Sequence, residues 1–197
     1  MKQLLILIII LSNLNLFGQD LTIINKNVDF ADSLNYNKEI RIYRTSGMTN
    51  YTGIFRFYQD NKEKWRAELI NHYAIIPNQK EFRIEKRKLK SKRKMDLVWL
   101  EILKTNIQDL PNMTDIDWKL KKEPVIQDMN GEKVLSWKKN LILDGDGYYV
   151  HFRQGKYFNR VYYSNPESYL RIYKNVDELV YFNELLNLIR TEFGVWK

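Results

Sequence analysis

The sequence predicts an α+β fold, in which an antiparallel sheet of several hairpins carries two main helices packed on one face. In several short stretches, apolar and polar residues alternate with a period of two between turn residues, as expected of strands joined in hairpins. Two longer stretches carry apolar residues at helical spacing. Strands followed by a helix occur twice, an order typical of helices that cover one face of an antiparallel sheet.

The first strand is predicted in residues 39–46, with Ile40 and Ile42 on one face and Arg41 and Tyr43 on the other. A hairpin follows around the turn DNKE. Its first strand alternates apolar with polar residues, and its second strand places apolar residues on one face: Phe55 and Phe57 against Arg56 and Tyr58, then Trp65, Ala67 and Leu69. A further strand is predicted in KEFRIEKRKLK, where apolar alternation is lost from Lys86 onward.

Residues 96–110 predict an amphipathic helix, with Asp96 as its N-cap and Pro111 after its end. Its expected apolar stripe has four members: Leu100, Leu103, Ile107 and Leu110. Asn130-Gly131 then predicts a hairpin turn between two apolar runs. LILDGDGYYVHFRQGKYFNRVYYSN predicts a strand, a DGDG turn, a strand, a QGK turn and a strand.

Two helices are predicted near the end of the chain. Asn165-Pro166 begins a short one, with Asn as cap and Pro at the first helical position. Asp177 begins a longer one that Gly194 ends, and its apolar stripe has five members: Leu179, Phe182, Leu186, Ile189 and Phe193. The two strands-then-helix halves leave two interpretations open, namely an internal duplication and a likeness that alternating strands create by themselves.

Residues 1–18 predict a cleavable secretory signal. Lys2 supplies the positive start, Leu4–Leu11 an apolar run too short to span a bilayer, and Gly18 a small residue at the cleavage point. The remaining residues, 19–197, are expected to form a single α+β domain, soluble and exported to the periplasm or the medium. No other stretch reaches membrane-spanning length, and the chain has no cysteine, so its own core must stabilise it.

The net charge of +8 is concentrated in one segment. Residues 83–94 hold eight basic side chains and one acid, Glu85, and therefore carry +7. The eight are candidates for an anion site: Arg83, Lys86, Arg87, Lys88, Lys90, Lys92, Arg93 and Lys94. The alternative is structural, since lysines on an edge strand prevent sheet-to-sheet aggregation. Anionic lipid headgroups or an acidic envelope polysaccharide suit an exported protein better than nucleic acid does.

Aromatic residues in the last predicted strand pair suggest a second surface. His151 shares a face with Tyr149 and Arg153, opposite Tyr148 and Phe152. Four residues are the aromatic surface candidates, able to stack on sugars or to anchor a partner protein: Tyr149, His151, Tyr157 and Tyr163. The alternative is that tyrosine simply suits half-buried strands.

Catalytic and metal-binding patterns are missing from the sequence. It has no nucleophile elbow, HExxH helix, phosphate loop or dinucleotide fingerprint, and it has only two histidines. After Asp144, the twelfth position of an EF-hand loop is Gly155 instead of Glu. We therefore expect no catalytic residue, metal or cofactor. A hydrolase that uses two carboxylates stays open as the alternative, and paired acids with raised pKa values would favour it.

Three stretches resemble small secreted proteins of unknown function from Gram-negative bacteria: FGQD, ILKTNIQDLPNM and YSNPESYLRIYKNVDELVYFNELLNLIRTEF. The resemblance implies an exported single-domain protein of the envelope or the medium, and it implies no activity. Together with the charge and aromatic patterns, it leads us to expect a binding or interaction module. Its expected ligand is an anionic polymer, a lipid headgroup or a partner protein of the envelope.

Overall fold

The structure is a computed structural model, and the part of the chain that it describes falls into five stretches: residues 21–47, 49–77, 80–138, 140–142 and 145–196. The chain divides into two compact units, residues 1–33 and residues 34–197. The first unit contains the helix α2, Leu21–Asn27. The predicted signal, residues 1–18, lies outside the described residues.

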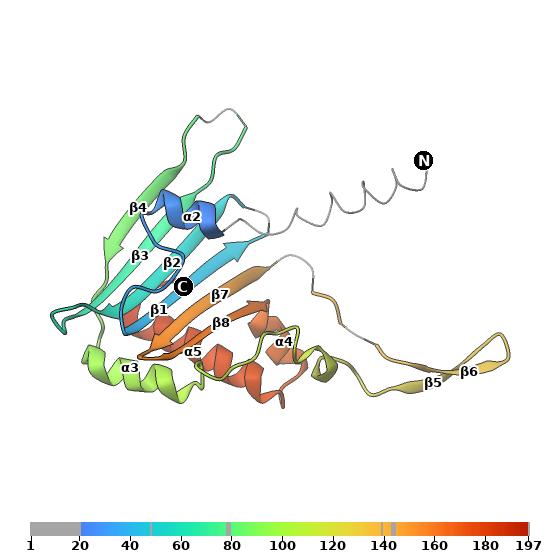
Figure 1. Cartoon of the computed structure of the whole chain (residues 1–197). Coiled ribbons are helices and arrows are strands. Elements are labelled where there is room, and N and C mark those ends of the chain that lie inside the picture. Colours follow the sequence, from blue (N-terminus) through green and yellow to red (C-terminus); the bar gives the residue numbers. More distant parts are fainter. Residues whose placement is uncertain (1–20, 48, 78–79, 139, 143–144, 197) are drawn as a thin grey trace. The chain divides into compact units, whose positions relative to one another are not determined.

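The second unit is built on a six-stranded sheet in the order β4-β3-β2-β1-β7-β8 (Figure 1). Every neighbouring pair in it is antiparallel, which confirms the predicted α+β fold with an antiparallel sheet. The strands are β1 Lys38–Ser46, β2 Tyr51–Gln59, β3 Trp65–Tyr73, β4 Arg83–Lys88, β7 Asp146–Gln154 and β8 Tyr157–Ser164.

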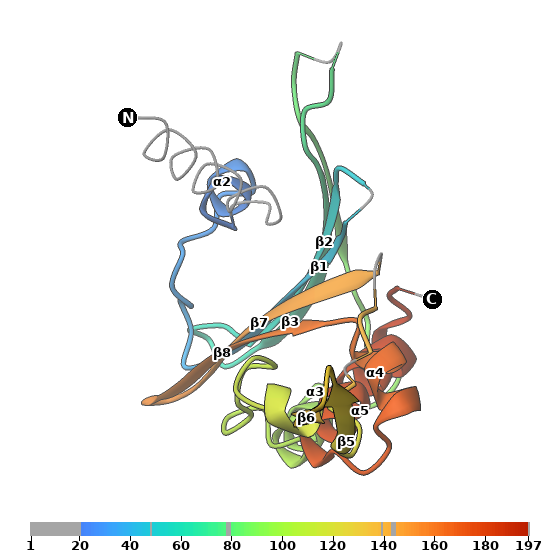
Figure 2. The same cartoon turned by 90° about the vertical axis from the view of Figure 1, so that its right-hand side faces the viewer.

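Three helices of this unit, α3, α4 and α5, lie on the same side of the sheet (Figure 2). They span Met95–Lys104, Pro166–Ile172 and Asp177–Phe193, and a 3-10 turn, η1, spans Asp117–Lys119. None of the described helices is long and apolar enough to cross a membrane.

The core lies between the sheet and these helices. Ile40, Ile42, Phe55 and Phe57 face it, as the alternation predicts. Aromatic rings dominate the contact, since Trp99 of α3 stacks on a ring of β7 at 5.5 Å and Phe182 of α5 on a ring of β8 at 4.0 Å. We refer to this side of the sheet as the helix face.

Helix α5 confirms its predicted stripe, because all five of its members are buried. Gly194 adopts a left-handed conformation with φ 65° and donates its N–H to the carbonyl of Arg190, which ends the helix where predicted. Pro166 occupies the first turn of α4, also as predicted.

Helix α3 differs from its prediction in boundaries and in face. It begins at Met95 with Lys94 as cap, and it ends at Lys104, because Asn106 adopts a left-handed conformation (φ 53°). Its buried residues are Val98, Trp99 and Ile102. Leu100 is exposed, so the predicted stripe was wrong at that position, whereas Leu103 is partly buried against the core. Ile107 and Leu110 reach the core from the turns that follow.

The Asn130-Gly131 hairpin is confirmed as a separate two-stranded sheet of β5, Val125–Met129, and β6, Glu132–Ser136. Both turn residues have positive φ, which a two-residue hairpin turn requires. The strand predicted at LIL was wrong, since Leu141 and Ile142 belong to no strand. The DGDG turn lies partly outside the described residues.

The two halves of the chain contribute unequally to the main sheet. The first half supplies four strands, β1 to β4, and then α3, whereas the second supplies β7 and β8 and then α4 and α5.

Replacing Phe182 with alanine removes a ring that is fully buried against β7 and β8. We expect Phe182→Ala to lower the free energy of unfolding by about 3–5 kcal/mol, because the cavity is enclosed by rings and cannot collapse. Urea denaturation followed by tryptophan fluorescence measures it. Glu184→Ala, at an exposed position of α5, is the control, and equal losses for the two variants would contradict the described packing.

Candidate functional site

The side of the sheet opposite α3, α4 and α5 carries charged and aromatic residues, together with the buried Ile54 and Ile70. Arg41 and Tyr43 of β1 point to this side, because their neighbours Ile40 and Ile42 point to the core. Cross-strand partners share a face, so the register extends the assignment to all six strands. We call this side the charged face.

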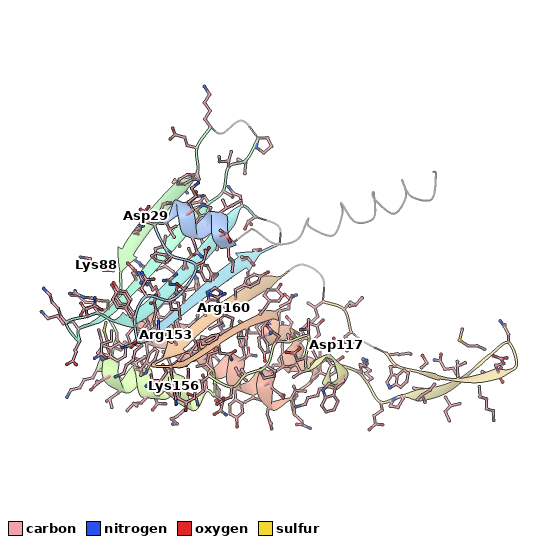
Figure 3. All side chains as sticks on the ribbon, in the orientation of Figure 1. Asp29, Lys88, Asp117, Arg153, Lys156 and Arg160 are labelled. Carbon is pink, nitrogen blue, oxygen red and sulfur yellow. The ribbon has the colours of Figure 1, made fainter. Side chains whose placement is uncertain are left out.

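One row of partners crosses the whole charged face. It joins Lys88 to Glu68, Glu68 to Arg56, Arg56 to Arg41, Arg41 to His151, and His151 to Arg160. We call these six residues the charged row. Every member is ionisable, and neighbouring strands lie only about 4.8 Å apart. Lys88 of β4 and Arg160 of β8, at its two ends, are labelled in Figure 3.

Glu39 of β1 holds the middle of the charged row together. Its Oε1 accepts one hydrogen bond from Nε of Arg41 and one from Nε of Arg56, both at 2.8 Å. Its Oε2 accepts the backbone N–H groups of Asn35 and Tyr36, at 2.8 and 3.0 Å. The carboxylate is fully buried, and these four hydrogen bonds replace the water that burial removes.

Aromatic rings and a second carboxylate hold Arg56 in place. Its guanidinium lies over the ring of Tyr58 at 4.3 Å and over that of Tyr36 at 5.4 Å, and the two rings stack on each other at 4.6 Å. Nη1 also reaches Oε1 of Glu68 at 3.3 Å. Arg56 is therefore fixed from three sides, and its charge stays in a defined place.

Burial raises the pKa of Glu39, but the charges of Arg41 and Arg56 and the hydrogen bonds to the carboxylate outweigh it, so the pKa is lowered. Glu39 and Glu68 are the acids of this face, and Arg56 lies between them. A lowered pKa in an ion pair suits a structural carboxylate better than a general acid.

The charged face carries an excess of positive charge. Its described strands hold seven cations, namely Arg41, Arg56, Arg66, Lys86, Lys88, Arg153 and Arg160, and two carboxylates, namely Glu39 and Glu68. The central members are buried, while Lys86, Lys88, Arg66 and Arg160 are exposed. The exposed excess positive charge therefore lies toward the two edges of the sheet, where an anion can reach it.

The structure divides the predicted basic run between different surroundings. Lys86 and Lys88 lie on the charged face of the edge strand β4, opposite Ile70 and Glu68. Arg83 and Arg87 have partners of the helix face, Lys90, Lys92 and Lys94 follow the strand, and Arg93 pairs with the buried Glu192 at 2.8 Å. Arg83 also stacks over the ring of Tyr73 at 4.2 Å. The run is thus not one continuous site.

The four aromatic candidates also separate. Tyr149 and His151 lie on the charged face, as the alternation predicts. Tyr163 was wrongly predicted to be a surface residue. It is fully buried on the helix face, because its ring stacks on Phe182 and its hydroxyl donates to the carbonyl of Pro111. Tyr157 is exposed but belongs to the helix face, since its partner is Gln154, which accepts the Trp99 indole N–H.

Strands β7 and β8 form the part of the charged face that combines rings with cations. Tyr149 lies against Tyr162 with ring centroids 4.3 Å apart. The next two pairs along the strands are His151 with Arg160 and Arg153 with Phe158. We call these six residues the β7–β8 patch: Tyr149, His151, Arg153, Phe158, Arg160 and Tyr162.

Sequence reasoning missed most of the charged face. It placed Arg41, Arg56 and Arg153 opposite the apolar residues of their strands but did not treat them as one set. The motif that could have found them is an arginine directly beside a core-facing apolar residue, which recurs in RIYR, IFRFY, HFRQ and NRVYY. Each strand alone shows an ordinary solvent face, and only the register joins them.

A polar cavity of about 600 Å³ lies beside α4. Asp146 and Glu167 line it, but Asp146 is paired with Arg44 at 2.8 Å and Glu167 with Arg190. Within the described residues, no group of three or more His, Asp or Glu side chains is placed to hold a metal ion. His72 and His151 stay apart, since β2 and β1 lie between their strands.

Comparison of the chain with protein-family models, with curated proteins and with solved structures finds no match.

Replacing Glu39 with glutamine leaves Arg41 and Arg56 without their shared charge. We expect Glu39→Gln to lower the free energy of unfolding by on the order of 3 kcal/mol at neutral pH, because breaking a buried ion pair leaves uncompensated charge. Glu85→Gln, in an exposed pair with Arg83 at 3.7 Å, should cost less than about 0.5 kcal/mol.

The same variant gives a test by pH. Because the pKa of Glu39 is lower in the folded protein, its stabilisation is complete above the ordinary glutamate pKa of about 4.3 and is lost as the pH falls through the lower folded value. The stability gap between wild type and Glu39→Gln should therefore narrow on acidification. Urea denaturation at a series of pH values measures it, and a gap that stays constant down to about pH 3 would contradict the ion-pair role.

Proposed function

We propose that this protein is an exported binding module whose charged face takes an anionic polymer of the bacterial envelope. The observation that carries the proposal is the charged row, in which Lys88 and Arg160 are exposed at the two ends and arginines held by Glu39 lie between them. The leader-like sequence of residues 1–18 supports export.

A polymer fits this surface better than a small anion does. The cations are spread over six strands and are not gathered around one point. At about 4.8 Å per strand, the row from Lys88 to Arg160 spans roughly 24 Å. A chain of repeated acidic groups can contact both ends of such a row, whereas a single phosphate or carboxylate can contact one.

The fixed geometry of the central arginines favours binding as well. Glu39 and the rings of Tyr36 and Tyr58 immobilise Arg56 before any ligand arrives. Arg56 is only 8% exposed, so its interactions fix the strands that carry the exposed cations and do not contact the ligand directly. The exposed lysines and Arg160 then supply attraction that weakens as salt screens it.

The first test reverses one exposed charge of the row. We expect Arg160→Glu to weaken binding of inorganic polyphosphate about three- to tenfold at low salt, and the difference should shrink at high salt. Lys104→Glu, an equal charge change at an exposed site of α3, is the matched control. Isothermal titration calorimetry measures both. Equal weakening by the two variants would mean that only net charge matters, and it would overturn the assignment of binding to the charged row.

The second test separates the parts of the basic run. Lys86→Glu with Lys88→Glu should weaken polyphosphate binding, because both residues lie on the charged face of β4. Lys92→Glu with Lys94→Glu makes the same change of charge beyond the end of that strand and should have little effect. Vesicles of phosphatidylglycerol form a further arm, since preferred binding to them would assign the face to lipid headgroups instead of a polymer.

A further inference from the structure

The β7–β8 patch combines cations with aromatic rings in a regular order, which a simple cation site does not require. Phe158, Arg160 and Tyr162 alternate along β8 on the charged face, so a cation lies between two rings. At about 3.4 Å per residue, the two rings are roughly 14 Å apart and the cation is about 7 Å from each. Phe158 is 77% exposed, so its ring is accessible to a ligand.

Strand β7 strengthens each part of this pattern. Tyr149 packs against Tyr162 and makes a broader ring surface at one end, while His151 lies beside Arg160 in the middle. At the other end, Arg153 lies beside Phe158 and is anchored to the carbonyls of Gly155 and Leu34, at 3.0 and 3.2 Å. Burial, followed by the neighbouring Tyr162, raises the pKa of Tyr149, which keeps its hydroxyl neutral and able to donate.

A ligand that matches this pattern has flat apolar faces at intervals and acidic groups between them. Sugar rings offer such faces together with hydroxyls that bond to tyrosine, and acidic sugars add the charge. Polyphosphate has the charge but no apolar face. Single-stranded nucleic acid also combines the two features, but an exported protein would not ordinarily meet it.

We propose that the β7–β8 patch binds an acidic oligosaccharide, whose sugar rings stack on Phe158 and on the Tyr149–Tyr162 pair while Arg160 and His151 contact its carboxylates. This inference rests on the proposed function and names the chemical class of its ligand. The spacing of the two rings along β8 favours an extended chain of sugars that lies along the strand. The position of β8 at the edge of the sheet favours the same arrangement.

The experiment compares an oligogalacturonate, its methyl ester and inorganic polyphosphate as ligands. The wild type should bind the oligogalacturonate more tightly than either of the others, because only that probe offers both rings and charge. Phe158→Leu keeps an apolar side chain but removes the ring, and it should weaken oligogalacturonate binding about fivefold while polyphosphate binding is unchanged. Tyr157→Leu, a ring-removing change at the adjacent exposed position of the helix face, should change neither.

The outcomes separate this inference from the proposed function. Equal binding of oligogalacturonate and polyphosphate, both lost in Arg160→Glu and both unaffected in Phe158→Leu, would overturn the sugar assignment and keep the anion-binding module. Binding of neither probe would overturn both. An oligothymidylate bound more tightly than the oligogalacturonate would reassign the rings to base stacking and would also overturn the sugar assignment.

Discussion

The rest of this structure depends on the carboxylate that Glu39 shares between Arg41 and Arg56. Without it, two guanidinium groups would be buried side by side on adjacent strands without their shared counter-charge, at a cost on the order of 3 kcal/mol. With it, β1 can carry Ile40 and Ile42 on its helix face and Arg41 on its charged face. The central strand β1 therefore contributes one face to the hydrophobic core and the other face to the charged row.

Fold and site are therefore linked through register. The pairing that places Phe57 beside Ile40 in the core also places Arg56 beside Arg41 on the charged face. A slip of one residue would bring cations into the core and apolar rings to the charged face, so packing against α3 and α5 fixes the site as firmly as it fixes the fold. The edges differ from this rigid centre. On β4 and β8, the side chains of Lys88 and Arg160 are exposed to solvent.

Much of the fold was predictable because its causes are local. Alternation in EIRIYRTS and YTGIFRFYQ, the Asn130-Gly131 turn and the stripe of α5 each act within a few residues. The predictions of burial were wrong where the local pattern of a segment competes with its packing against other segments. Leu100 fits a helical stripe in sequence, but α3 rotates to bury Trp99, whose ring reaches Phe57 and Phe152. Tyr163 was likewise predicted to lie at the surface, but its ring is covered by Phe182.

The sequence by itself determined the α+β class, the alternation within each strand and the concentration of charge in residues 83–94. Only the tertiary structure decided that Lys88 and His151 belong to one row and that Arg93 pairs with Glu192 instead of joining a site. It alone also decided that five arginines from different strands line the same face. The physical reason is that side-chain direction follows from local backbone geometry. Pairing between distant strands depends on the packing of the whole sheet, so it cannot be predicted from any single segment.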